Sequence, residues 1–107
     1  MTNAETKTAQ LEQLDAHQFV LSGELTMQTV PTVARDSQSL LNTMSGDIKI
    51  NLAKVVRADS AGLALLIDWL RTAQRNKFKL EFEHLPEQLK QIAKLSELHE
   101  LLPIHYS

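Results

Sequence analysis

The sequence has no cysteine and only three glycines, and both shortages narrow the chemistry open to it. Without cysteine, disulfides, zinc–thiolate sites, iron–sulfur clusters and a cysteine nucleophile are all excluded. Gly23, Gly46 and Gly62 are too far apart to form a phosphate-cradling loop or a dinucleotide-binding fingerprint. The four histidines form no HxH or HExxH pattern. We therefore expect neither a metal site nor a cofactor.

The sequence also lacks an excess of one charge and any long hydrophobic run. With 11 Lys and Arg against 13 Asp and Glu, the net charge is -2, which gives no basic footprint for nucleic acid or an anionic membrane. The longest apolar run, residues 61–67, is far shorter than the roughly 20 residues of a membrane span. The polar segment 1–7 does not resemble a signal peptide. We expect a cytoplasmic globular protein without direct membrane insertion.

What the sequence does contain is a regular succession of strand and helix patterns. Apolar residues alternate with polar ones in some segments, as in half-buried strands, and recur at helical spacing in others. The predicted order is strand, strand, helix, strand, helix, strand, helix, over residues 11–14, 17–22, 30–44, 48–52, 60–76, 78–82 and a last helix after Pro86, with Gly23 ending the second strand.

This order predicts the fold class. Strands that alternate with helices imply parallel pairs, while the first two strands are close enough for an antiparallel hairpin. We expect an α/β fold bordering on α+β, with a small mixed sheet and helices mainly on one face. The length of 107 residues fits one domain. We expect it to span residues 1–107, with residues 1–9 as a frayed or edge segment.

The polar turn between the third predicted strand and the second helix is the most informative segment. Asp59 and Ser60 are both preferred N-cap residues, because a side-chain oxygen can accept a hydrogen bond from a free N–H of the first turn. One interpretation is that they only cap the helix. The other is that Ser60 accepts a phosphate, whose charge of about -1.5 to -2 is favoured at a helix N-terminus. A hydrolase triad is disfavoured because the G-x-S-x-G turn is missing, so we expect no catalytic residue.

The helix after this turn is predicted to carry an outward apolar patch. At about 100° per residue, its large apolar side chains form one core stripe. Ala61, Ala64 and Leu65 fall on the opposite face, beside Ser60. Such a patch suits the docking of a partner protein. The alternative interpretation is ordinary variation among surface residues.

Two motifs resemble those of STAS domains, the sulfate-transporter and anti-sigma-factor-antagonist family. Asp59-Ser60-Ala61-Gly62-Leu63 is similar to the family signature D-[ST]-x-G-L. Ser22-Gly23-Glu24-Leu25 is similar to the S-G-E-L turn that follows the second strand. The element order predicted for residues 10–98 also resembles that of the family. The resemblance implies the STAS fold.

Within the family, residues 60–66 and 92–95 look most like the MlaB branch, the STAS subunit of the Mla phospholipid ABC transporter. This likeness implies a non-enzymatic cytosolic accessory subunit that binds and stabilises or regulates an MlaF-like ATPase subunit, and through it an inner-membrane permease. Such a complex maintains outer-membrane lipid asymmetry, and the chain would be peripheral to the inner membrane. The partner-binding residues implied are Gly23, Glu24, Leu25, Thr26, Asp59, Ser60, Ala61, Gly62, Ala64 and Leu65.

A second branch of the family gives an alternative function. In anti-sigma-factor antagonists the motif serine is phosphorylated, which would make Ser60 a phosphoacceptor and an anti-sigma-factor kinase the partner. Many members carry an aspartate where this chain has Thr26. This difference weakens any role that the family assigns to the carboxylate of that aspartate. A third hypothesis, a lipid-binding domain, has little support, because no segment predicts an apolar cavity for an acyl chain.

Overall fold

The computed structural model describes residues 8–95 and 104–105, which form a five-stranded sheet and three helices. The strands are β1 (Ala9–Gln13), β2 (Gln18–Leu25), β3 (Asp47–Ala58), β4 (Lys79–Glu83) and β5 (Ile104–His105). The helices are α1 (Val30–Leu41), α2 (Ser60–Asn76) and α3 (Glu87–Leu95). In the sheet order β1-β2-β3-β4-β5, β1 is antiparallel to β2 and all other neighbours are parallel. The predicted fold class and order of elements are confirmed.

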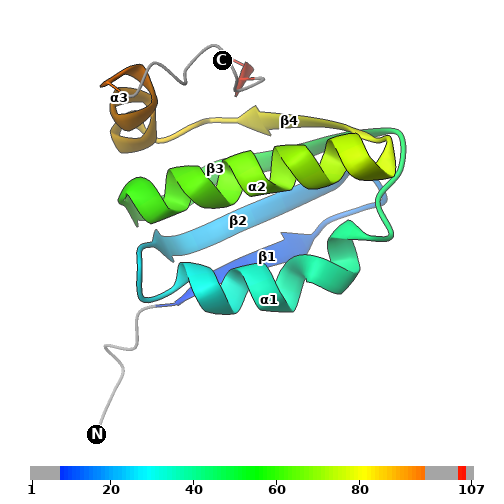
Figure 1. Ribbon diagram of the computed structural model, residues 1–107, viewed down its shortest axis with the longest axis horizontal. Coiled ribbons are helices and arrows are strands. Elements are labelled where there is room, and N and C mark those ends of the chain that lie inside the picture. Colours follow the sequence, from blue (N-terminus) through cyan, green and yellow to red (C-terminus); the bar gives the residue numbers. More distant parts are fainter. Residues whose placement is uncertain (1–7, 96–103, 106–107) are drawn as a thin grey trace, which may run out of the picture.

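The core lies between the sheet and its helices. Figure 1 shows α1 and α2 in front of the sheet, with α3 at one end beside the start of α2. Alternate strand residues face this helical layer, as the period of two requires. Their buried side chains meet those of the helices. In the sheet and helices together, the largest fully buried side chains are Trp69, Phe19, Phe82, Leu21, Leu25, Ile48, Ile50, Leu52, Leu65, Leu66 and Leu89.

Several element boundaries differ from the sequence predictions. The second strand does not end at Gly23 but runs on to Leu25. Gly23 has φ +96°, and a Cβ there would lie 2.1 Å from the carbonyl oxygen of Thr8, the residue that precedes β1. The glycine therefore permits a close approach inside the sheet instead of a turn out of it. The first helix ends at Leu41 rather than residue 44, and β5 was not predicted because two residues beside Pro103 give no strand pattern.

The segment expected to be frayed or at an edge, residues 1–9, lies outside the described residues except for Thr8 and Ala9. Ala9 begins β1, the edge strand.

Two irregularities displace the carboxyl end of β3 relative to β2. Val20 pairs with Asn51 but Ser22 with Lys54, and Gly23 pairs with Val55 but Glu24 with Arg57. At each step β3 contains an extra residue, which is the pattern of a β-bulge. Bulges bend a strand and increase its twist, and here they precede the turn that leads into α2.

Candidate functional site

The predicted site lies at one end of the molecule. Four segments meet there, at the left of Figure 1: the carboxyl ends of β2 and β3 and the first turns of α1 and α2. Asp59 follows β3, and its backbone N–H donates to the Leu25 carbonyl at the end of β2 (3.0 Å). The S-G-E-L and D-S-A-G-L motifs, more than thirty residues apart in sequence, are thus adjacent in space.

Asp59 joins the two motifs through its side chain. One carboxylate oxygen accepts from the Ala61 N–H (2.8 Å), so Asp59 is the N-cap of α2. The other accepts from the Met27 N–H (3.3 Å) in the turn after β2. Both oxygens therefore bind backbone amides of the fold. The capping interpretation is correct for Asp59, so the hydroxyl of Ser60 is not needed to cap the helix.

Ser60 is the first residue of α2, and its side chain is exposed. Within the described part of the chain its hydroxyl has no hydrogen-bond partner. Ala64 is exposed one turn further along and Ala61 is partly exposed. Together with Asp59 and Met27 these residues form what we call the Ser60 surface: Met27, Asp59, Ser60, Ala61 and Ala64. It offers two small alanine side chains, the apolar Met27 side chain and one free hydroxyl beside the Asp59 carboxylate, at the positive end of a helix dipole.

The prediction that Leu65 faces outward is wrong. Its side chain is 2% exposed, and Thr72, on the same side of the helix, is also buried. The physical reason is that α2 packs against the sheet while α1 and α3 contact it as well. Its buried stripe is therefore wider than that of a helix lying alone on a sheet. Leu65 belongs to the core and cannot contact a partner while the fold is intact.

The residues expected from the turn after β2 are only partly accessible. Leu25 and Thr26 are buried, whereas Gly23 and Glu24 are partly exposed. The Thr26 hydroxyl accepts from the Gln28 N–H (3.3 Å), and its backbone N–H donates to the Thr29 hydroxyl (3.0 Å). Thr26 thus holds the turn that presents Met27.

Thr29 occupies the N-cap position of α1, but its side chain makes no capping hydrogen bond there. Its hydroxyl donates instead to the Glu24 carbonyl and supports the same turn.

Gly62 is buried beneath the Ser60 surface. A Cβ at this position would lie 2.9 Å from the Leu25 Cβ and 3.2 Å from the Leu25 carbonyl oxygen. The glycine allows α2 to approach the end of β2 closely. The glycine of the signature is therefore explained by packing. Gly62 contributes to the Ser60 surface only by setting the position of α2.

Met27, which no sequence pattern singled out, is 73% exposed and forms the apolar part of the Ser60 surface. The available signal was a lone large apolar residue in a polar turn, two residues after the S-G-E-L motif. Its importance depends on the Asp59 carboxylate, which lies 32 residues away in sequence and fixes the Met27 backbone.

The described residues, 8–95 and 104–105, contain neither a metal-binding cluster nor a membrane-spanning helix. No group of three or more His, Asp or Glu side chains there could hold a metal ion. None of the helices in that part of the chain is long and apolar enough to cross a membrane.

Comparison with known sequences identifies related proteins. The family model described as "Mlab, STAS domain" matches residues 9–103. Anti-sigma-B factor antagonists of Staphylococcus epidermidis are 25% identical over 91 residues, which is 85% of this chain and 84% of the relative. Both matches are long enough to include the two motifs that meet at the Ser60 surface.

Solved structures share the fold. An anti-sigma factor antagonist from Mycobacterium paratuberculosis superimposes with a TM-score of 0.74 at 18% identity, over 98% of this chain and 90% of that one. The phosphorylated form of the Bacillus cell fate determinant SpoIIAA superimposes with a TM-score of 0.69 at 16% identity, over 92% and 90%. At these identities the likeness concerns the fold alone.

Proposed function

The chain belongs to the STAS domain family, and from that premise we propose that it is a non-enzymatic regulatory domain that binds a partner protein through the Ser60 surface. The observation that carries this proposal is the division of roles between two neighbours. Asp59 uses both carboxylate oxygens within the fold, whereas the Ser60 hydroxyl is exposed among small or apolar side chains. Exposed small and apolar side chains around a hydroxyl suit protein docking, and the charge of a phosphate on Ser60 would disrupt it.

An anti-sigma factor is the partner class that the names of the sequence relatives support, and the family resemblance implies that this partner is a kinase. Those relatives are named anti-sigma-B factor antagonists and cover most of this chain. In that case the kinase would phosphorylate Ser60, and the added charge would change binding without a change of fold. The exposed position of Ser60 at the start of α2 is compatible with access by a kinase.

The ATPase subunit of an ABC phospholipid transporter is a second candidate partner. It is favoured by the family description, "Mlab, STAS domain", and by the likeness of residues 60–66 to the MlaB branch. Here the Ser60 surface would dock on an MlaF-like ATPase and place the chain, with a permease, at the cytoplasmic side of the inner membrane. Ser60 would remain unmodified and make a direct contact.

One experiment tests the docking proposal and separates the partners. The tagged full chain is purified from its native cells in mild detergent, and mass spectrometry identifies the partners and the mass of the Ser60 peptide. The variants Ser60→Glu and Ala64→Asp add a negative charge to the surface, and we expect each to reduce partner recovery by about tenfold or more. Gln74→Glu adds the same charge to an exposed position further along α2 and should not.

The outcomes lead to different conclusions. A kinase-like partner with phosphate on Ser60 establishes the anti-sigma function, and an ATPase with its permease and unmodified Ser60 establishes the transporter function. Wild-type recovery of the partner with both charged variants would overturn the Ser60 surface as the docking site. Circular dichroism checks that the variants are folded, which we expect because both positions are exposed.

A further inference from the structure

The outer edge of β1 is unpaired among the residues that the structure describes. The Glu24 N–H donates to the Thr8 carbonyl, and the Leu14 N–H donates to the Gln18 carbonyl. In an antiparallel pair such bonding residues alternate, so the even-numbered residues of this strand bond to β2. The N–H and C=O groups of Ala9, Leu11 and Gln13 consequently point away from the sheet. This is the pattern that another strand recognises.

A groove runs beside this edge. It has a volume of about 690 Å³ and lies between β1 and α1. Thr8, Ala9, Gln10 and Leu11 line the strand side, and the side chains of Ala9 and Leu11 are only partly buried. The α1 side comes from positions three or four apart, which form one helix face: Thr29, Thr32, Val33, Asp36, Ser37 and Leu40. A strand added to β1 would direct every second side chain into this groove.

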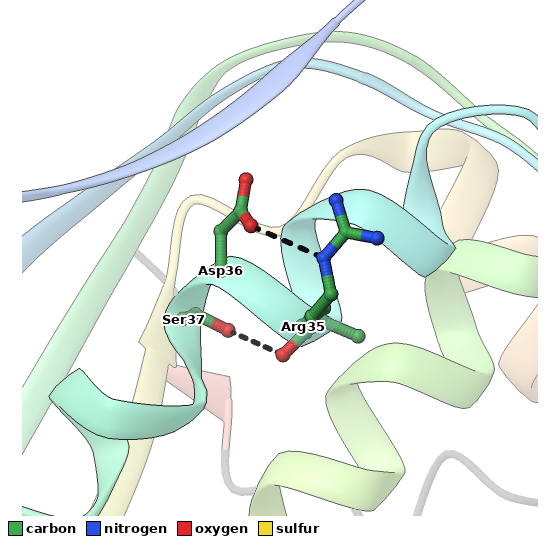
Figure 2. Close-up of polar contacts among 4 residues, drawn as sticks. Arg35, Asp36 and Ser37 are labelled. Carbon is green, nitrogen blue, oxygen red and sulfur yellow. Dashed lines mark hydrogen bonds and ion pairs between the residues drawn. The ribbon is translucent and has the colours of Figure 1, made fainter.

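The chemistry of the groove indicates which side chains would enter it. Val33 and Leu40 provide apolar surface, and Thr32 and Asp36 are exposed at the rim. Figure 2 shows Asp36 in contact with Arg35 Nε (3.5 Å) through one carboxylate oxygen. Both side chains of this pair are well exposed, so the ion pair is weak and exchangeable. Asp36 can therefore accept a cation from an incoming segment.

The position of α1 distinguishes a partner's strand from a second copy of this chain. In Figure 1, α1 lies on the outer side of β1. Two-fold symmetric, antiparallel pairing of β1 with its copy would bring both α1 helices over the same junction. Neighbouring strands are only about 4.8 Å apart, whereas packed helix axes need about 8–10 Å. A single extended segment has no covering helix and meets no such obstacle.

We propose that the α1–β1 groove binds an extended segment of a partner protein as a sixth strand of the sheet. Its backbone hydrogen-bonds to Ala9, Leu11 and Gln13. Its alternate side chains, small or apolar, enter the groove, and a lysine or arginine lies beside Asp36. This mode is β-strand addition, in which main-chain bonds give affinity and pockets for alternate side chains give specificity. The site does not include Ser60 and does not depend on the function proposed above.

The test uses a phage-displayed library of random short peptides selected on the full chain, and the selected peptides are then titrated against variants. Leu11→Pro removes one outward N–H while the bonds of Gln10 and Glu12 to β2 remain. Leu11→Ala also shortens this groove-lining side chain but keeps the N–H, so it is the reference for the loss of the N–H. Thr32→Tyr fills the groove from α1, and Gln38→Tyr places the same side chain on an exposed position outside the groove.

We expect selected peptides with an alternating apolar pattern and a cation. Leu11→Pro should weaken their binding by about tenfold or more relative to Leu11→Ala, and Thr32→Tyr by about tenfold or more relative to Gln38→Tyr. Amide chemical shifts should change at Ala9, Leu11 and Gln13. Equal binding to Thr32→Tyr, or no selected peptide at all, overturns the proposal, and this holds even where Leu11→Pro fails to fold. A dimer that Leu11→Pro converts to monomer also overturns it, because the occupant is then a second copy.

Discussion

Asp59 and Ser60 are both residues that cap helices, yet the fold gives them opposite roles. The Asp59 carboxylate binds the first turn of α2 and the Met27 amide. Ser60 then begins the helix with an exposed side chain. The same pair of residues thus supplies a structural anchor and, directly beside it, a group available to a partner. A change at Asp59 should therefore affect stability, whereas a change at Ser60 should affect binding.

At the residue scale we predict that Asp59→Ala destabilises the fold. It removes the N-cap of α2, worth about 1 kcal/mol, and also the acceptor of the Met27 N–H. Urea unfolding should show a free energy of unfolding lower by roughly 1–2 kcal/mol. Asp68→Ala removes an exposed carboxylate from the same helix and should leave stability nearly unchanged. Equal stability of the two variants would contradict the structural role of Asp59.

At the scale of elements, α3 supplies a hydrogen-bond acceptor to the end of β3, where no described strand pairs with it on that side. β4 pairs with β3 only from Asp47 to Asn51, so the last residues of β3 have no neighbour on that side among the described strands. The Gln88 side chain of α3 accepts a hydrogen bond from the Ala58 N–H (2.9 Å). This contact holds the end of β3, one residue before Asp59, and links α3 to the Ser60 surface.

We predict that Gln88→Leu destabilises the chain by about 1–3 kcal/mol, because the partly buried Ala58 N–H loses its acceptor. The Ala58 amide should also exchange its hydrogen faster than in the wild type. Gln88→Glu retains an acceptor at the same reach and should preserve most of the protection. Gln91→Leu makes the same substitution at an exposed position of α3 and serves as the control. Unchanged exchange at Ala58 in Gln88→Leu would refute the contact.

At the scale of the whole molecule, one core connects the sheet to the helices. Trp69 of α2 is 1% exposed and is the only tryptophan in the sequence. It belongs to a continuous cluster of buried residues that includes all three helices and strands β2 to β4. A single core in a chain of this size favours cooperative unfolding.

We therefore predict that tryptophan fluorescence and far-ultraviolet circular dichroism report the same urea transition. The fluorescence monitors the packing around Trp69, while the circular dichroism monitors all helices and strands. Coincident midpoints are expected for the wild type and for the exposed-surface variant Gln74→Glu. A fluorescence change well before the loss of secondary structure would mean that the helical layer separates from the sheet independently.

Local pattern alone predicted most of the elements. Alternation in residues 48–52 and 78–82, and helical spacing in residues 60–76, are properties of short segments, so they could be read without knowledge of the fold. The D-S-A-G-L motif likewise identified where the helix begins. Boundaries were less accurate where a distant residue matters, as at Gly23, where the Thr8 carbonyl oxygen leaves no room for a Cβ.

The sequence by itself determined the α/β class, the order of the elements and the position of Ser60 at a helix start, because these follow from periodicity and capping within short segments. Only the tertiary structure decided which residues share the surface. Leu65 is buried because α1 and α3 both contact α2, and Met27 joins Ser60 because Asp59 reaches a turn 32 residues away. Helical periodicity describes one helix, whereas burial and long-range hydrogen bonds depend on what packs around it.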